Sequence, residues 1–193
     1  MKDENSVETR MVYDTLGRVS TVTQAYGTSL AATTTFTYND VGNVTEIESP
    51  NGTVVTYTYD NANRLSAMED DLGNTVSYTR DDAGNIITRE RKDPSSTLKY
   101  THSKTYDEMS RLLTSVGAGA AWDRTYAYDK NSNLTTSTDA NSNATTYAYD
   151  GLDRLITSTD ALSGVTENTI NDLDQTTAIE DPRTNTTTYA YNA

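Results

Sequence analysis

The chain has 193 residues, of which only 34% are hydrophobic and none is cysteine, which argues against a large apolar core and excludes disulfides and thiolate metal sites. Its 28 acidic and 15 basic side chains give a net charge of -13, which repels nucleic-acid phosphates and anionic membranes. No apolar run is long enough to span a membrane, and the first residues lack the basic and then apolar order of a signal peptide. We therefore expect no nucleic-acid partner, no membrane insertion, and any export signal outside this sequence.

The residue types favour strands. Tyrosine outnumbers phenylalanine 14 to 1 and threonine is abundant, and both prefer half-buried strand positions. The prolines Pro50, Pro94 and Pro182 fall outside the alternating segments, as in turns. The composition predicts an all-β protein with polar faces.

After a lead or cap at residues 1–12, an array of repeats is predicted over residues 13–193. The motif Tyr-Asp-x-x-Gly-Arg-Leu recurs about every 21 residues, with units starting near 13, 38, 59, 80, 106, 128, 149 and 170. Its first column holds Tyr13, Tyr38, Tyr59, Tyr106, Tyr128, Tyr149 and Tyr191, with Arg80 and Ile170 in the remaining copies. A ninth copy is cut at 191, so we expect the chain to be a piece of a longer array.

The next columns predict a tight turn. The second column has short acceptors that bond the backbone two residues on: Asp14, Asn39, Asp60, Asp81, Asp107, Asp129, Asp150 and Asn171. Three residues later stand Gly17, Gly42, Asn63, Gly84, Ser110, Ser132, Asp153 and Asp174. Glycine, asparagine and aspartate tolerate positive φ, so a type I turn closed by a left-handed residue is expected, with Ser110 and Ser132 fitting less well.

Strands flank each turn. An aliphatic column follows it: Val19, Val44, Leu65, Ile86, Leu112, Leu134 and Leu155, with Thr176 in the last copy. A second turn, as at Pro50–Thr53 or Asp71–Asn74, returns the chain to the next tyrosine pair. We predict tandem 21-residue β-hairpins that form a β-solenoid or an open spiralling sheet strip, with the tyrosines as a stacked ladder. Loops are expected at about residues 23–33 and 91–104, where the alternation is interrupted.

One column alternates between guanidinium and amide side chains. After the glycine position stand Arg18, Asn43, Arg64, Asn85, Arg111, Asn133, Arg154 and Gln175. We infer a structural period of two units. Each arginine is expected beside a tyrosine ring or a turn aspartate of a neighbouring unit.

The motif and its spacing resemble the YD repeats of Rhs proteins, wall-associated bacterial proteins, insecticidal toxin-complex C subunits and teneurins. Residues 13–19 match in full, and the copies at Tyr59 and Tyr149 match except at the glycine position. The resemblance covers about residues 11–193. It implies a β-sheet strip that spirals into a hollow shell, often around a toxin domain, and secretion or surface display. The family's Asp-Pro-rich self-cleaving segment has no counterpart here.

Chemical sites are weakly indicated. His102 is the only histidine and is expected in an irregular insertion, Lys92–Lys104, which argues against a triad or a multi-histidine metal site. The pairs Asp70-Asp71 and Asp81-Asp82 fall at predicted turns. Residues 129–133 and 139–143 imitate the start of a calcium loop but lack its later glycine and glutamate. No catalytic, cofactor or metal site is predicted.

The leading interpretation is therefore a structural protein, part of a secreted or surface shell that encloses, carries or displays a cargo. An adhesin that binds glycans or a receptor through exposed aromatic and amide side chains is the alternative. An enzyme is not expected. Self-association, end to end or edge to edge, is expected between copies, and the partner would be a glycan or a protein cargo.

Overall fold

The computed structural model describes residues 7–119 and 121–192, and within them the chain forms 17 strands and no helix. No helix capable of crossing a membrane occurs in this part of the chain. The all-β prediction is confirmed. The strands are β1 (Arg10–Tyr13), β2 (Val19–Gln24), β3 (Ala32–Tyr38), β4 (Val44–Glu48), β5 (Val54–Tyr59), β6 (Leu65–Asp70), β7 (Thr75–Arg80), β8 (Ile86–Lys92), β9 (Leu98–Tyr106), β10 (Leu112–Gly117), β11 (Arg124–Tyr128), β12 (Leu134–Asp139), β13 (Ala144–Tyr149), β14 (Leu155–Thr159), β15 (Val165–Ile170), β16 (Thr176–Glu180) and β17 (Thr186–Thr188).

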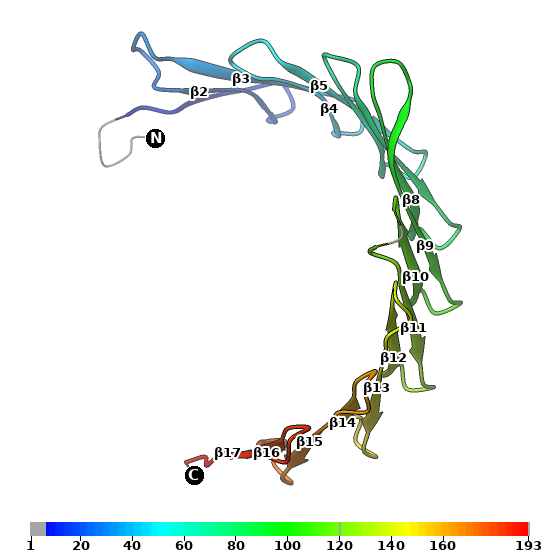
Figure 1. The fold of residues 1–193 in the computed structure, drawn as a ribbon. Coiled ribbons are helices and arrows are strands. Elements are labelled where there is room, and N and C mark those ends of the chain that lie inside the picture. Colours follow the sequence, from blue (N-terminus) through cyan, green and yellow to red (C-terminus); the bar gives the residue numbers. More distant parts are fainter. Residues whose placement is uncertain (1–6, 120, 193) are drawn as a thin grey trace. The chain divides into compact units, whose positions relative to one another are not determined.

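The chain divides into two compact units, residues 1–101 and 102–193, and strand β9 runs across the division. In unit 1, each strand from β1 to β8 pairs antiparallel with the next strand along the chain (Figure 1). In unit 2, the same order continues from β9 to β17. Consecutive antiparallel pairing makes each unit an open sheet strip. The β-solenoid alternative, in which successive coils stack, does not describe these units.

Register gives each strip two chemically distinct faces. Residues directly opposite each other on paired strands point to the same side, and residues along a strand alternate. Tyr57 pairs with Met68 and Met68 with Val76, which defines the tyrosine face in unit 1. On the other side, the threonine face, Thr136 pairs with Thr146 and Thr146 with Thr159 in unit 2.

Neither unit has a hydrophobic core of the usual kind. No hydrophobic side chain in the described residues is fully buried, and the tyrosine and aliphatic columns are mostly half-buried by their neighbours within the sheet. Tyr149 and Leu155, for example, are cross-strand partners and both are half-buried. A single-layer strip therefore depends on cross-strand pairs and hydrogen bonds between repeats for its stability.

The two expected loops have different outcomes. Residues 25–31 do form a loop between β2 and β3, within the narrower bounds that the strands leave. The prediction of a loop at residues 91–104 is wrong. There, β8 and β9 are lengthened, and a tight turn joins them in which Asp93 N donates to Thr97 O at 3.0 Å and Ser96 N donates to Asp93 O at 2.8 Å. Pro94 has the φ that the first corner of such a turn requires, so the additional residues extend the ladder instead of interrupting it.

The predicted lead at residues 1–12 is only partly described. Residues 1–6 lie outside the described residues. Arg10, Met11 and Val12 belong to β1 and pair with Thr23, Val22 and Thr21 of β2. The described end of the lead is therefore part of the sheet.

Candidate functional site

The turn at Asp14–Arg18 shows the construction common to the repeats. Asp14 N donates to Arg18 O at 2.8 Å and Gly17 N donates to Asp14 O at 3.0 Å. Gly17 has φ of 77°, and the register shifts beside Tyr13, as expected for a type I turn closed by a left-handed residue. The Asp14 Oδ1 atom accepts from the backbone N–H groups of Leu16 and Arg18, both at 2.9 Å. One carboxylate oxygen thus holds two backbone donors of the turn.

Positive φ recurs at the glycine position of each repeat. The prediction is confirmed for Gly17, Gly42, Asn63, Gly84, Asp153 and Asp174. The reservation about the two serines is wrong, because Ser110 and Ser132 adopt φ of 61° and 73°. Their N–H groups make the same turn bonds, to Asp107 O at 2.9 Å and to Asp129 O at 3.2 Å, so the backbone pattern imposes a conformation that serine does not prefer by itself.

The second turn of each repeat, predicted at Pro50–Thr53 and Asp71–Asn74, is found at the opposite edge of each strip. It has the same construction as the first turn, which the sequence interpretation did not predict. Asp70 N donates to Asn74 O at 3.1 Å, Gly73 N donates to Asp70 O at 2.9 Å, and Asp70 Oδ1 accepts from Leu72 N and Asn74 N. The same backbone bonds close the turns 49–53, 93–97, 139–143, 160–164 and 181–185. The signal was present in the sequence as aspartate or serine three residues before glycine, serine or threonine. Asp70 opens a turn of this edge and Asp81 opens one of the first edge, so the neighbouring acids Asp70-Asp71 and Asp81-Asp82 both lie at turns.

Tyrosine hydroxyls join consecutive repeats. Tyr38 Oη donates to Val19 O at 2.7 Å, and Tyr59 Oη donates to Val44 O at the same distance. In unit 2 the corresponding bonds run from Tyr128 to Leu112 O, from Tyr149 to Leu134 O and from Tyr191 to Thr176 O, at 3.0, 3.0 and 2.8 Å. Each acceptor is the residue of the preceding repeat that directly follows the column of arginine and amide side chains. The tyrosines are therefore more than a ring ladder, since they tie one repeat to the next through the backbone.

Two copies that lack this tyrosine fill its role differently. Arg80 Nη1 donates to Leu65 O at 2.8 Å in place of a phenol. Ile170 cannot donate, and Asn168, two residues earlier on the same face, reaches Leu155 O at 3.3 Å. The acceptor carbonyl thus has a donor despite the divergence of the column.

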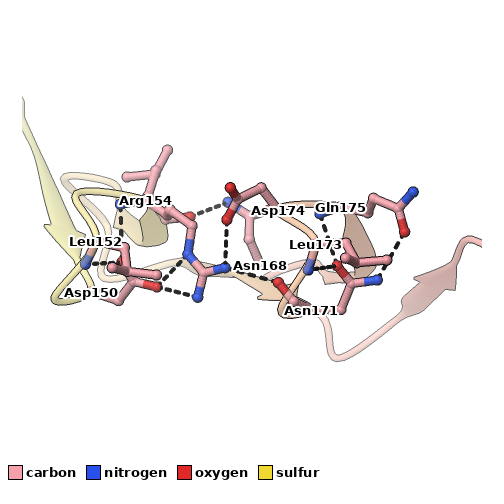
Figure 2. Close-up of polar contacts among 9 residues, drawn as sticks. Asp150, Leu152, Arg154, Asn168, Asn171, Leu173, Asp174 and Gln175 are labelled. Atoms are coloured by element: carbon pink, nitrogen blue, oxygen red, sulfur yellow. Dashed lines mark hydrogen bonds and ion pairs between the residues drawn. The ribbon is translucent and has the colours of Figure 1, made fainter.

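Arginines join neighbouring turns, as Figure 2 shows for Arg154. Arg154 Nε donates to Asp150 Oδ2 at 2.6 Å within its own turn, and its Nη1 donates to Asn171 O at 2.9 Å and to Asp174 Oδ1 at 3.0 Å in the next turn. Arg111 repeats the pattern, with Asp107 Oδ2 at 2.6 Å and Asp129 O at 2.8 Å. A planar guanidinium can make these bonds at once because its donors diverge from one centre.

Arg18 shares this environment, whereas Arg64 shares the bond to the aspartate of its own turn. Arg18 bonds Asp14 Oδ2 at 2.7 Å and Asn39 O at 3.1 Å, and Arg64 bonds Asp60 Oδ2 at 2.8 Å. Arg18 and Arg111 also lie over the rings of Tyr38 and Tyr128, with centroid distances of 4.6 and 4.9 Å. The predicted environment is confirmed for Arg18 and Arg111, which lie on a tyrosine ring, and for Arg154, which bonds the Asp174 carboxylate of the next turn. All four arginines also bond the aspartate of their own turn, and Arg18, Arg111 and Arg154 bond a backbone carbonyl of the next turn, which the sequence does not predict.

The amide residues of this column form a second set. Asn133 Nδ2 donates to Asp129 Oδ2 at 3.1 Å and to Asp153 Oδ1 of the next turn at 2.7 Å. Asn43 Nδ2 donates to Asn63 Oδ1 at 3.3 Å, also in the next turn. The amides therefore link side chain to side chain, whereas Arg18, Arg111 and Arg154 also reach a backbone carbonyl of the next turn.

These bonds shift the ionisation of the turn acids. The pKa of Asp150 is lowered, first by the side-chain hydrogen bond from Arg154, and that of Asp14 first by the backbone N–H of Arg18. The pKa is also lowered for Asp60, Asp70, Asp81, Asp93, Asp107, Asp129, Asp139 and Asp181. Burial raises the pKa of Tyr149.

Candidate chemical residues are placed as follows. His102 lies in strand β9 and not in an irregular insertion, and its Nε2 is 2.7 Å from the Ser115 hydroxyl of β10. Within residues 129–133, Asp129 Oδ1 accepts from the N–H groups of Asn131 and Asn133, each at 2.9 Å. Asp139 does the same for the turn that follows β12. The Asp-x-Asn-x-Asn spacing that resembles a calcium loop therefore stabilises these turns, because backbone N–H groups of the asparagines donate to the aspartate carboxylate.

The repeat geometry agrees with a comparison to known families. The family model described as RHS Repeat matches residues 38–75 and 128–165. The chain therefore contains RHS repeats. Each match begins at a column tyrosine, Tyr38 or Tyr128, and contains the next one, Tyr59 or Tyr149.

Several solved structures are similar to this chain in fold. The crystal structures titled TcdB2-TccC3-Cdc42 and TcdB2-TccC3 are each 14% identical with a TM-score of 0.51, and cover 85% and 84% of this chain. The Photorhabdus luminescens Tc holotoxin pore is 14% identical with a TM-score of 0.50 over 86% of the chain. In each case the aligned part is 12% of the other chain. At this identity the likeness establishes the fold. No curated protein sequence matches this RHS-repeat chain.

Proposed function

We propose that this RHS-repeat chain is a section of a wall, which in the complete protein encloses, carries or displays a cargo. The observation that supports this role is the bonding from repeat to repeat. Tyrosine hydroxyls, arginines and amides of one repeat bond groups of an adjacent repeat, as in Tyr149 to Leu134 O and Arg154 to Asn171 O. These side chains therefore hold adjacent repeats together in a continuous sheet.

The burial pattern suits a wall as well. In both units the side chains of the sheet are at most half-buried, so each strip is a single layer that separates two spaces. The similar solved structures are titled as Tc assemblies, one with Cdc42 as an added component. By that likeness, the cargo of this chain would be a protein.

The test uses the complete reading frame that contains this chain. We expect electron cryomicroscopy to show the repeats as a sheet around an internal space, and an enclosed segment to resist protease until the sheet is unfolded. Repeats with solvent on both faces, together with equal digestion of every segment, would refute the wall. Fractionation of the producing cells tests the proposed extracellular or surface location.

The adhesin alternative predicts a different result. A wall section shows no saturable glycan binding, whereas an adhesin binds defined glycans at low and at moderate salt. A glycan array with the purified chain separates the two roles, and saturable binding would favour the adhesin.

A further inference from the structure

Unit 1 contains a depression of about 440 Å³ whose lining includes Val55, Met68, Val76 and Arg91. These four residues share the tyrosine face. Val55 lies two residues from Tyr57, Met68 pairs with Val76, and Val76 pairs with Arg91. Three apolar side chains thus form a floor beside one guanidinium. The volume lies within the range of small-ligand and side-chain pockets.

Three carboxylates line this depression. Glu69 lies on the threonine face, since it pairs in register with Thr56 and Thr75, and the other two are already bonded. Asp70 accepts from Leu72 N, Asn74 N and Asn74 Nδ2. Asp93 pairs with Lys99, Oδ2 to Nζ, at 2.8 Å. None of the three carboxylates is therefore placed to neutralise Arg91.

Arg91 and Arg89 remain as cations without an acidic partner. Both side chains are exposed, and in the part of the chain that the structure describes neither has a carboxylate within ion-pair distance. Arg89 pairs in register with Tyr78, so both arginines point to the tyrosine face of β8, two residues apart. In a protein with a net charge of -13, this is a local positive site next to an apolar floor.

We propose that this depression binds an acidic peptide, with a glutamate or aspartate on Arg91 and Arg89 and large apolar residues on Val55, Met68 and Val76. A guanidinium binds a carboxylate through two parallel hydrogen bonds, which sets the orientation of the peptide. The row Arg91–Val76–Met68 crosses neighbouring strands at about 4.8 Å per strand. An extended peptide places alternate side chains about 7 Å apart on one side, so a leucine two residues after the acid falls between Val76, about 4.8 Å from Arg91, and Met68, about 9.6 Å from it.

This inference goes beyond the proposed wall function. Peptide binding is measured on this chain alone, and a chain that binds no peptide could still be a section of a wall. The probe is the peptide acetyl-Glu-Thr-Leu-Thr-Leu-amide, titrated into the ¹⁵N-labelled chain. We expect saturable amide shifts confined to β5–β8. A peptide with lysine in place of glutamate should bind at least about tenfold more weakly, as expected when a charged hydrogen-bonded pair is lost.

Variants separate the site from general charge effects. Arg91→Gln should weaken binding about tenfold, and Met68→Ala should weaken it through the loss of the floor. The matched control is Arg124→Gln, which removes the same charge from an exposed position of β11 in unit 2 and should leave the affinity unchanged. Unchanged shifts outside β5–β8 verify that each variant is folded. Absence of saturation, equal binding of the lysine peptide, or an unaltered affinity of Arg91→Gln would each overturn the proposal.

Discussion

The hydroxyl of Tyr149 donates to the carbonyl oxygen of Leu134 at 3.0 Å, where the ladder between β12 and β13 has ended. The pairs of that ladder are Thr136 with Thr146, Ser137 with Thr145 and Thr138 with Ala144. Beyond them the two strands lead into different turns of the same edge. The phenol therefore closes the open end of the hairpin and fixes the spacing of consecutive repeats.

Replacing Tyr149 by phenylalanine should lower the free energy of unfolding by about 1 kcal/mol, because it deletes this one hydrogen bond and leaves the ring in place. Urea unfolding followed by circular dichroism measures the change. The matched control is Tyr147→Phe, two residues earlier on the same face, whose hydroxyl makes no hydrogen bond within the described residues. Equal effects of the two variants would show that the Tyr149 bond does not contribute.

Arg80 offers the reciprocal experiment. Its Nη1 occupies the place of a phenol on Leu65 O at 2.8 Å. Arg80→Met should lower the free energy of unfolding by about 1 kcal/mol, whereas Arg80→Tyr should restore the donor of the repeat and cost less than half of that. Urea unfolding of the two variants decides this, and a tyrosine variant no more stable than the methionine variant would contradict it.

Acid should destabilise the chain over a defined range of pH. The pKa values of Asp14, Asp150 and the other turn aspartates are lowered in the folded state from 3.8. Their contribution to stability is therefore fully present above about pH 4 and is lost as the pH falls through the lowered folded-state values. Thermal unfolding between pH 7 and pH 2 should show a constant midpoint above about pH 5 and a fall below about pH 4.

Asp150→Asn is the control for this pH dependence. The amide keeps an oxygen that can accept from the turn, as Asn39 and Asn171 do at the same position, but it does not titrate. The variant should be less stable than the parent at pH 7 and should lose less stability at low pH. A steeper acid loss in the variant would contradict the assignment.

Threonine is the least suitable residue type found at the left-handed position of a turn. Thr184 has φ of 64° in the turn 181–185, where a β-branched side chain is strained. Thr184→Gly should raise the free energy of unfolding by about 1 kcal/mol, because glycine adopts this conformation without the steric cost. Ser163→Gly, at φ of 66° in the turn 160–164, should give a smaller gain since serine is unbranched. Urea unfolding compares the two, and a destabilised Thr184→Gly variant would refute the strain.

Some features of the fold followed from the sequence alone. The position of Gly17 in its motif and the alternation around Tyr57 and Tyr59 were enough to predict the strands and the type of the first set of turns, because both depend on local backbone preferences. The turn at residues 93–97 was not recognised. Asp93 and Ser96 supply its acceptor and its left-handed residue, but Ser96 does not stand out from ordinary loop residues as glycine does.

Contacts between repeats could be predicted only in part. The alternation of Arg154 with Gln175 and Asn133 indicated distinct environments for arginines and amides. The acceptors of Arg154 in the next turn include the carbonyl oxygen of Asn171. Such a contact is not predictable from the sequence, because every residue has a backbone carbonyl. The contact of His102 with Ser115 depends on the register of β9 and β10, where Gly117 is opposite His102. Register across a hairpin is set by turn geometry, so the pattern of residues around His102 does not predict its partner.

Self-association remains a prediction. The donors of one repeat fit the carbonyls of an adjacent repeat, as in Tyr38 to Val19 O, so equivalent surfaces of two copies can continue the array end to end. The net charge of -13 opposes this contact, and salt screens it over a length of about 8 Å at physiological ionic strength. Light scattering across a concentration series should therefore show a mass that rises with protein concentration, and more steeply at high salt than at low salt. A monomeric mass at every salt concentration would show that the repeat surfaces do not join separate copies, and a mass that falls with salt would indicate association through opposite charges instead.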